Sequence, residues 1–108
     1  MAGFTGLGTT RLGLRMLAAP SVRGPVVALD VKGWLSPLAA WEVGVDPGRL
    51  VIVRSSDPAI WVQLAAVLLE GVGAIYAEVP PTVSDRDLRR LAALARARRA
   101  GLALRPLG

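Results

Sequence analysis

The glycine-rich start of the chain has the spacing of a phosphate-binding loop. In the stretch GFTGLGTT, Gly3, Gly8 and Thr10 occupy the first-glycine, last-glycine and hydroxyl positions of the pattern G-x-x-x-x-G-K-[ST], with Gly6 between them. Such a loop binds phosphate through its backbone N–H groups, its lysine reaches the terminal phosphates, and its hydroxyl binds Mg²⁺. Here Thr9 stands in the lysine position. The spacing therefore predicts a phosphate cradle that lacks its principal cation.

Polar residues also follow two apolar runs that are typical of buried strands. Asp30 and Lys32 come at or just after the end of the run 25–31, and Glu78 lies near the end of the run 74–79. In a parallel sheet the carboxyl ends of the strands meet at one edge, where ligand crevices form. We expect these three side chains to lie at that edge, beside the glycine-rich loop.

The elements that must position these residues alternate along the chain. Near-continuous apolar runs indicate strands buried on both faces, and cap-plus-proline pairs indicate helix starts. The expected strands are 25–31, 50–53, 74–79 and 102–104, and the expected helices are 10–19, 36–43, 57–70 and 84–100. This alternation predicts one α/β domain over residues 1–108, with three layers and a mainly parallel sheet covered by helices on both faces.

The strand that normally precedes a phosphate loop is missing from this pattern. Only Met1 and Ala2 come before Gly3. We expect either that this strand has been lost or that the chain begins partway into a larger domain. An incomplete sheet could pair its edge with another chain, so self-association is also expected.

Composition excludes several classes of chemistry. The 108 residues contain no cysteine and no histidine, which removes disulfides, thiol nucleophiles, histidine catalysis and the commonest transition-metal ligands. The apolar stretch 59–77 is interrupted by Gln63, Glu70, Gly71 and Gly73, so we expect a helix and a strand there, not a membrane span. A cytoplasmic protein is the resulting expectation.

The net charge of +5 lies entirely in the last quarter of the chain, where residues 81–108 hold seven arginines and two aspartates. A helical projection of 84–100 places one set of arginines opposite an apolar side formed by leucines and alanines. These arginines are Arg86, Arg89, Arg90 and Arg96. They could contact nucleic-acid phosphates or an acidic partner, or form a solvated outer face.

The order of several segments resembles the RecA family of P-loop ATPases. In that family a strand ends in Asp-x-Glu, a short helix follows, and a Gly-Val-Asp turn leads to the next strand. The matching segments here are 27–32, 34–37, 44–50 and, for the Walker B strand, 74–78. Lys32 stands where the family has its catalytic glutamate, and Glu78 replaces the Walker B aspartate. The resemblance therefore implies a trimmed RecA-like P-loop core that has lost its hydrolytic groups.

The lost groups imply a nucleotide site that is vestigial. Its residues would be Gly3, Gly6, Gly8, Thr9, Thr10, Asp30, Lys32 and Glu78. Without the loop lysine and the water-activating acid, phosphoryl transfer lacks its main stabilising charges. We therefore expect no enzyme activity and no cofactor, with residual binding of ATP and Mg²⁺ as the alternative.

Degenerate RecA-like proteins of the ImuA type are accessory factors of bacterial damage-induced mutagenesis, and this chain is similar to them. That similarity implies a scaffold in DNA repair or translesion synthesis that works through protein contacts. The implied partners are a Y-family-polymerase-like protein or RecA, in the bacterial cytoplasm and near the nucleoid. A direct DNA-binding module that uses the basic helix 84–100 is the other alternative.

Overall fold

The structure is a computed structural model that describes residues 2–3, 13–33 and 35–107. Strands and helices alternate along the chain, as the apolar runs predict. The elements are β1 (Ala2–Gly3), α2 (Ala18–Arg23), β2 (Val26–Asp30), α3 (Pro37–Glu42), β3 (Leu50–Arg54), α4 (Pro58–Leu69), β4 (Ala74–Val79), α5 (Asp85–Arg98) and β5 (Gly101–Pro106).

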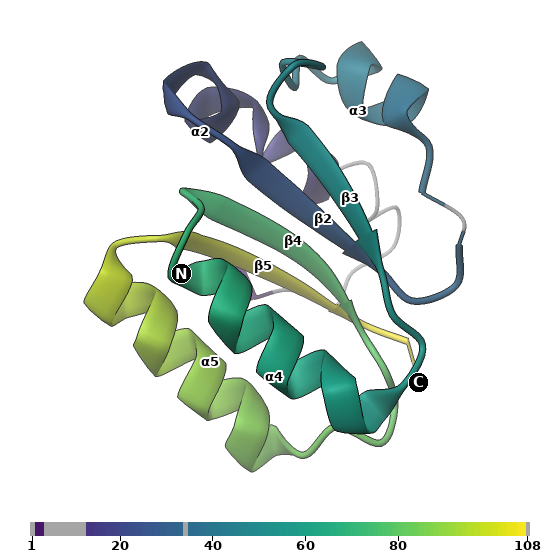
Figure 1. The fold of residues 1–108 in the computed structure, drawn as a ribbon, viewed down its shortest axis with the longest axis vertical. Helices are drawn as coiled ribbons and strands as arrows, with labels where there is room; N and C mark the ends of the chain where they lie inside the picture. Colours follow the sequence, from purple (N-terminus) through teal and green to yellow (C-terminus); the bar gives the residue numbers. More distant parts are fainter. Residues whose placement is uncertain (1, 4–12, 34, 108) are drawn as a thin grey trace.

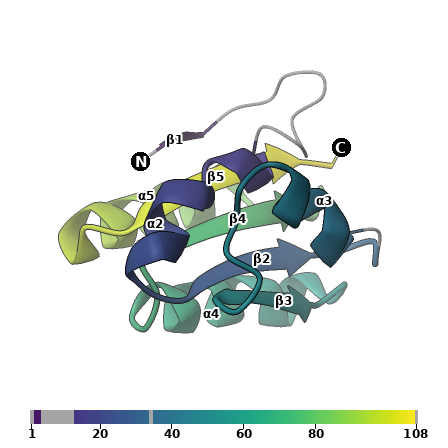
Figure 2. The same cartoon turned by 90° about the horizontal axis from the view of Figure 1, so that it is seen from above.

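All strand pairs in the sheet are parallel, and the strand order is β1-β5-β4-β2-β3. Helices α4 and α5 cover one face of the sheet, and α2 and α3 lie on the other (Figures 1 and 2). The predicted three-layer α/β architecture is therefore confirmed. The strand expected to be missing is present as the two-residue β1, which pairs Ala2 with Ala103 of β5.

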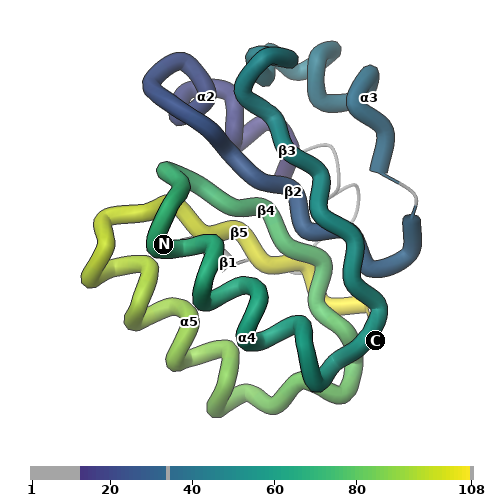
Figure 3. The backbone as a smooth tube through the Cα atoms, in the orientation of Figure 1, coloured from purple at the N-terminus to yellow at the C-terminus, as the bar shows by residue number. Residues whose placement is uncertain are grey.

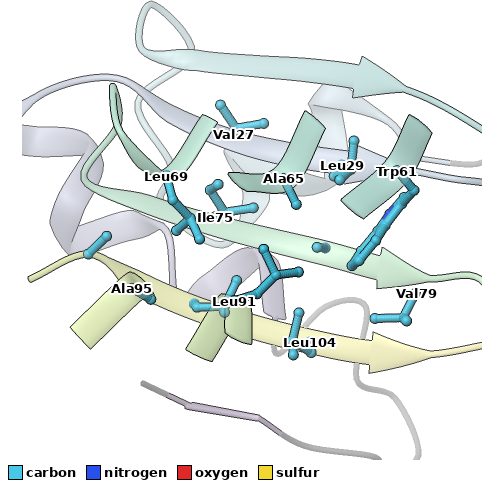
Figure 4. Packing of buried hydrophobic residues seen from close by; sticks show 13 residues of the cluster. Val27, Leu29, Trp61, Ala65, Leu69, Ile75, Val79, Leu91, Ala95 and Leu104 are labelled. Atoms are coloured by element: carbon cyan, nitrogen blue, oxygen red, sulfur yellow. The ribbon is translucent and has the colours of Figure 1, made fainter. Parts of the chain in front are cut away.

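The sheet separates two apolar clusters because neighbouring side chains of a strand point to opposite faces. Val27 and Leu29 of β2 face α4 and α5, where they pack with Trp61 and Leu69 (Figure 4). The residues between and beside them, such as Val26 and Ala28, belong to the cluster on the α2 and α3 side. Every residue of β2 and β4 is buried, because the side chains on both faces of these strands pack against other parts of the domain. This accounts for the nearly continuous apolar runs.

Strand β3 differs from the prediction of a buried strand. It lies at the edge of the sheet and pairs with β2 alone among the described strands. No residue of β3 is fully buried, and Val51 is 49% exposed. An apolar run of four residues cannot by itself distinguish a central strand from an edge strand, because strand order is a tertiary property.

Side-chain caps start the helices where the sequence predicts them. Ser36 accepts a hydrogen bond from the N–H of Leu38, and Asp57 accepts one from the N–H of Ala59. Ser84 accepts one from the N–H of Asp87. These bonds satisfy N–H groups that have no partner inside the helix.

Two helix ends differ from the sequence prediction. The sequence predicts a helix over residues 10–19 followed by Pro20, but Pro20 is the third residue of α2, in a first turn where proline is tolerated. Residues 13–15 are helical and are separated from α2 by a turn. The sequence also predicts that the last helix runs to residue 100, with Gly101 as the usual stop residue. Instead α5 ends at Arg98, Arg99 takes the left-handed conformation with φ 56°, and Gly101 begins β5.

The turns that lead into β2, β4 and β5 lie at one end of the domain (Figure 3), the amino edge of the sheet. The carboxyl ends of these strands form the opposite edge. Among the described residues, no helix is long and apolar enough to cross a membrane.

Candidate functional site

Two buried carboxyl groups meet at the carboxyl edge of the sheet. Asp30 is the last residue of β2 and Glu78 is the fifth of β4, which pairs directly with β2. Both residues are almost completely buried, with exposed fractions of 0% and 1%. The structure therefore brings these two acids together at the edge where the sequence analysis expects them. Buried acids are rare unless they are paired or hydrogen-bonded, so their partners decide their role.

Asp30 holds the loop between β2 and α3. Its Oδ1 accepts a hydrogen bond from the N–H of Gly33 at 2.9 Å, and its Oδ2 accepts one from the N–H of Leu35 at 3.2 Å. The guanidinium of Arg54, on β3, donates to the same Oδ2 at 3.3 Å. Burial raises the pKa of Asp30, but hydrogen bonds from Leu35, Glu78, Gly33 and Arg54 outweigh it. The net effect is a lowered pKa.

Glu78 is the member of the pair whose pKa is raised. Its Oε1 accepts a hydrogen bond from the N–H of Val31 at 3.0 Å, and its Oε2 lies 3.8 Å from Nη1 of Arg105. Burial is the largest cause of its shifted pKa and raises it, and the neighbouring Asp30 carboxylate adds to the rise. The hydrogen bond from Val31 opposes this rise without cancelling it. The two carboxyl groups can therefore share a proton across the β2–β4 boundary.

Of the other residues of the predicted nucleotide site, Lys32 joins this pair through its backbone N–H, which is hydrogen-bonded to Glu78. Lys32 follows β2 and is exposed. Gly3 lies in β1, whereas Gly6, Gly8, Thr9 and Thr10 lie outside the described residues. The described residues contain no group of three or more acids arranged to hold a metal ion. The carboxyl oxygens of Asp30 and Glu78 bind backbone N–H groups and arginines. Through these bonds the two residues hold the β2–α3 loop in place, and the pair is called the Asp30–Glu78 latch below.

The predicted arginine face exists on α5. Arg86, Arg89, Arg90 and Arg96 are all exposed, while Leu91 on the opposite side of the helix is buried. Of the four, Arg90 forms an ion pair of 3.5 Å with Asp87, one turn earlier. The other three make no ion pair with another described residue, so their charges are available to a partner.

An apolar hollow of about 440 Å³ lies between α4 and α5, beside this arginine face. Its lining is Val62, Ala66, Arg90, Leu91, Ala93 and Leu94. On the outer surface of α4, Ile60 and Val67 are also more than half exposed, at 53% and 66%. A surface helix normally presents polar residues to solvent. Apolar residues around all sides of α4 are therefore the signal of a contact surface.

The sequence interpretation of this segment missed that signal. It predicts a helix and a strand in the apolar stretch 59–77, which is correct, but it predicts no contact surface there. The absence of a polar stripe within 58–69, where Gln63 is the one polar residue, could have indicated an exposed apolar side.

The fold and the latch define a parallel α/β domain whose buried acids hold a loop. Within that class, the chain matches the MT3502 N-terminal domain over residues 2–105 and belongs to that family. It is also similar to the crystal structure of SulA from Pseudomonas aeruginosa, with a TM-score of 0.73 and 18% sequence identity. The match covers 98% of this chain and 94% of SulA. No curated protein matches the chain.

The resemblance to RecA-like P-loop ATPases and to the ImuA type is therefore wrong as an assignment. The family match is to the MT3502 N-terminal domain, and SulA is a similar solved structure. The physical reason for the error is that apolar strands ending in acids are shared by many parallel α/β domains. In this chain Asp30 and Glu78 are occupied by the amides of the β2–α3 loop.

Proposed function

We propose that this domain is a non-enzymatic, cytoplasmic interaction module of a bacterial DNA-damage response, and that it binds an acidic protein segment on its α4–α5 face. The observation that carries the proposal is the apolar hollow between the two helices, which is lined in part by Arg90 of the exposed arginine face of α5. The fold similarity to SulA supports the damage-response setting.

The chemistry of the α4–α5 face favours a protein over a nucleic acid. A DNA duplex needs cations for its phosphates and hydrogen-bonding groups for its bases, and it would leave the apolar lining of the hollow uncovered. A protein segment can place an apolar side chain against Val62, Ala66 and Leu94 while its carboxylates meet the arginines. Apolar anchors inside a charged rim are the usual anatomy of protein interfaces.

An amphipathic helix with acidic residues beside its apolar stripe fits this surface. It would lie along the groove of two packed helices, which is a recurring mode of peptide recognition. The arginines Arg86, Arg89 and Arg96 would speed its association and fix its orientation. A Y-family-polymerase-like protein or RecA would qualify as the source of such a segment.

Direct DNA binding is the second candidate function, because the same three arginines make no ion pair with a described residue. The two functions differ in their use of the hollow. The variant Ala93→Gln adds a neutral, helix-compatible side chain at an exposed residue that lines the hollow. The matched control Ala97→Gln places the same side chain on an exposed residue of α5 that does not line it.

Fluorescence anisotropy with a labelled acidic amphipathic peptide and a labelled short DNA duplex separates these cases. We expect the peptide to bind, Ala93→Gln to weaken that binding about tenfold, and Ala97→Gln to leave it unchanged. Binding of the duplex alone, with no effect of Ala93→Gln, would establish the DNA-binding alternative. Failure of both ligands to bind at low salt, or turnover of ATP in the presence of Mg²⁺, would contradict the proposal.

A further inference from the structure

A second hollow, also of about 440 Å³, lies at the amino edge of the sheet. Its lining comes from α2 and from the turns into β2, β4 and β5, and these turns lie together at this end of the domain (Figures 1 and 3). The lining residues are Ala19, Pro20, Arg23, Gly24, Gly73, Arg99 and Gly101. Two arginines from separate helices therefore face one hollow, at the edge opposite the Asp30–Glu78 latch.

Arg99 lines this hollow from an unfavourable backbone conformation. Its φ is 56°, and it is the one residue other than glycine with a positive φ in the described part of the chain. The N–H of Arg99 donates hydrogen bonds to the carbonyl oxygens of Ala95 and Arg96. The N–H of Ala100 also donates to the carbonyl oxygen of Ala95. This is a helix end at which glycine is preferred, since a Cβ is strained in the left-handed region.

The helix dipole does not account for an arginine at this position. A cation near a helix C-terminus is favourable, and Arg23 in the last turn of α2 gains from that effect. In α5, however, Arg96 and Arg98 already supply cations in the last turn, with ordinary helical geometry. Arg99 therefore adds backbone strain at a helix end where Arg96 and Arg98 already supply the favourable positive charge. A strained residue at a hollow is a reason to look for a ligand.

Two of the three glycines that line the hollow are also unexplained by the fold itself. An added Cβ at Gly24 or Gly73 would meet no atom within 4 Å, and neither residue has a φ in the left-handed region, whereas a Cβ at Gly101 would lie 3.3 Å from that of Ala74. A side chain at either position would therefore be tolerated by the protein and would stabilise it by restricting the unfolded chain. A Cβ on either residue would instead take up space beside the hollow they line.

The charge of the hollow is one-sided. None of the residues that line it is acidic. Glu70, at the C-cap of α4, is engaged by Arg98, whose Nη2 lies 2.9 Å from its Oε1. Neither Arg23 nor Arg99 makes an ion pair with another described residue. Two arginine residues in the lining of one open volume, with no acidic residue among its neighbours there, would attract an anion.

We propose that this hollow binds a small phosphate-bearing anion, with Arg23 and Arg99 as its ligands. Guanidinium groups match phosphate because each can donate two parallel hydrogen bonds to its oxygens. Ala19 and Pro20 form an apolar wall that would receive the organic part of a phosphate ester. This site is separate from the α4–α5 hollow, so the inference does not depend on the proposed protein partner.

The test uses the whole domain and two probes, inorganic pyrophosphate and phenyl phosphate, titrated by calorimetry at constant ionic strength. Both share the phosphate group, and phenyl phosphate adds an apolar body for the Ala19–Pro20 wall. We expect saturable binding that Arg99→Gly and Arg23→Gln each weaken about tenfold or more. The control Arg96→Gln removes one exposed charge from α5 outside the hollow, and it should leave affinity within about twofold.

The same Arg99→Gly variant provides a second readout. Because glycine accepts the left-handed conformation, the midpoint of its urea unfolding without ligand should equal or exceed that of the wild type. Gain of stability with loss of binding is the expected pair of results. The inference is overturned by an absence of saturable binding, by equal effects of Arg96→Gln and Arg99→Gly, or by a lower unfolding midpoint for Arg99→Gly.

Discussion

Replacement of Asp30 by asparagine tests whether the buried acid pair is a structural latch. Asparagine has nearly the same shape as aspartate, but it substitutes an NH₂ donor for one carboxylate oxygen. In the wild type, Oδ1 accepts from Gly33 at 2.9 Å and Oδ2 accepts from Leu35 at 3.2 Å. An amide can keep one of these two bonds, and its NH₂ group then faces the other N–H. The variant therefore loses a hydrogen bond and leaves a buried donor without an acceptor.

The magnitude follows from these contacts. A hydrogen bond to a charged group contributes about 1.5–3 kcal/mol, and an unsatisfied buried donor adds a desolvation cost of similar order. The side chain of Arg54 is 64% exposed, so solvent screening leaves its ion pair with Asp30 little weight. We expect Asp30→Asn to lower the free energy of unfolding by roughly 2–4 kcal/mol. A domain of ordinary stability would remain folded but clearly weakened.

Urea unfolding at pH 7, followed by tryptophan fluorescence, measures this loss. Glu78→Gln is the matched control, because its amide oxygen can still accept from Val31 and its neutral side chain avoids the cost of burying a charge. We expect that variant to stay within about 1 kcal/mol of the wild type. The reasoning is refuted if Asp30→Asn is as stable as the wild type, or if Glu78→Gln is equally damaging.

The two shifted pKa values also predict the pH dependence of stability. The pKa of Asp30 is lowered from its ordinary value of 3.8, so its contribution is complete above pH 3.8 and is lost as the pH falls through the folded-state pKa. The pKa of Glu78 is raised from 4.5, so stability is lost as the pH rises above 4.5 and through the raised value. Unfolding free energies measured across pH should therefore peak in mild acid, and Glu78→Gln should remove the decline on the alkaline side.

Three further substitutions test the packing and the helix start. Gly13→Ala would place a Cβ 2.2 Å from Cδ1 of the buried Tyr76, so overpacking should cost about 1–3 kcal/mol in chemical denaturation; an unchanged midpoint would contradict this. Leu69→Ala, at a residue 1% exposed, should cost about 2–5 kcal/mol and lower the melting temperature by calorimetry. Ser84→Ala removes the cap that accepts from Asp87 and should cost about 0.5–2 kcal/mol, whereas Ser84→Asp should restore most of it.

The sequence predicted the main elements because their signals are local. The cap-plus-proline pairs at Ser36 and Asp57 start helices through a bond to an N–H two residues ahead. The strands 26–30 and 74–79 are buried on both faces, and the continuous apolar runs reflect this directly. The prediction at Arg99 failed because glycine is the usual residue in a left-handed helix end, and the sequence pattern pointed to Gly101.

The sequence by itself determined that the domain is a parallel α/β sheet with Asp30 and Glu78 near the ends of two strands. The tertiary structure decided what those acids do, because their partners Gly33, Leu35 and Arg54 come from a loop and a neighbouring strand whose positions depend on strand order. Only the fold revealed the two hollows, since each is assembled from elements far apart in the chain. Local patterns determine elements, whereas the meeting of distant side chains depends on how those elements pack.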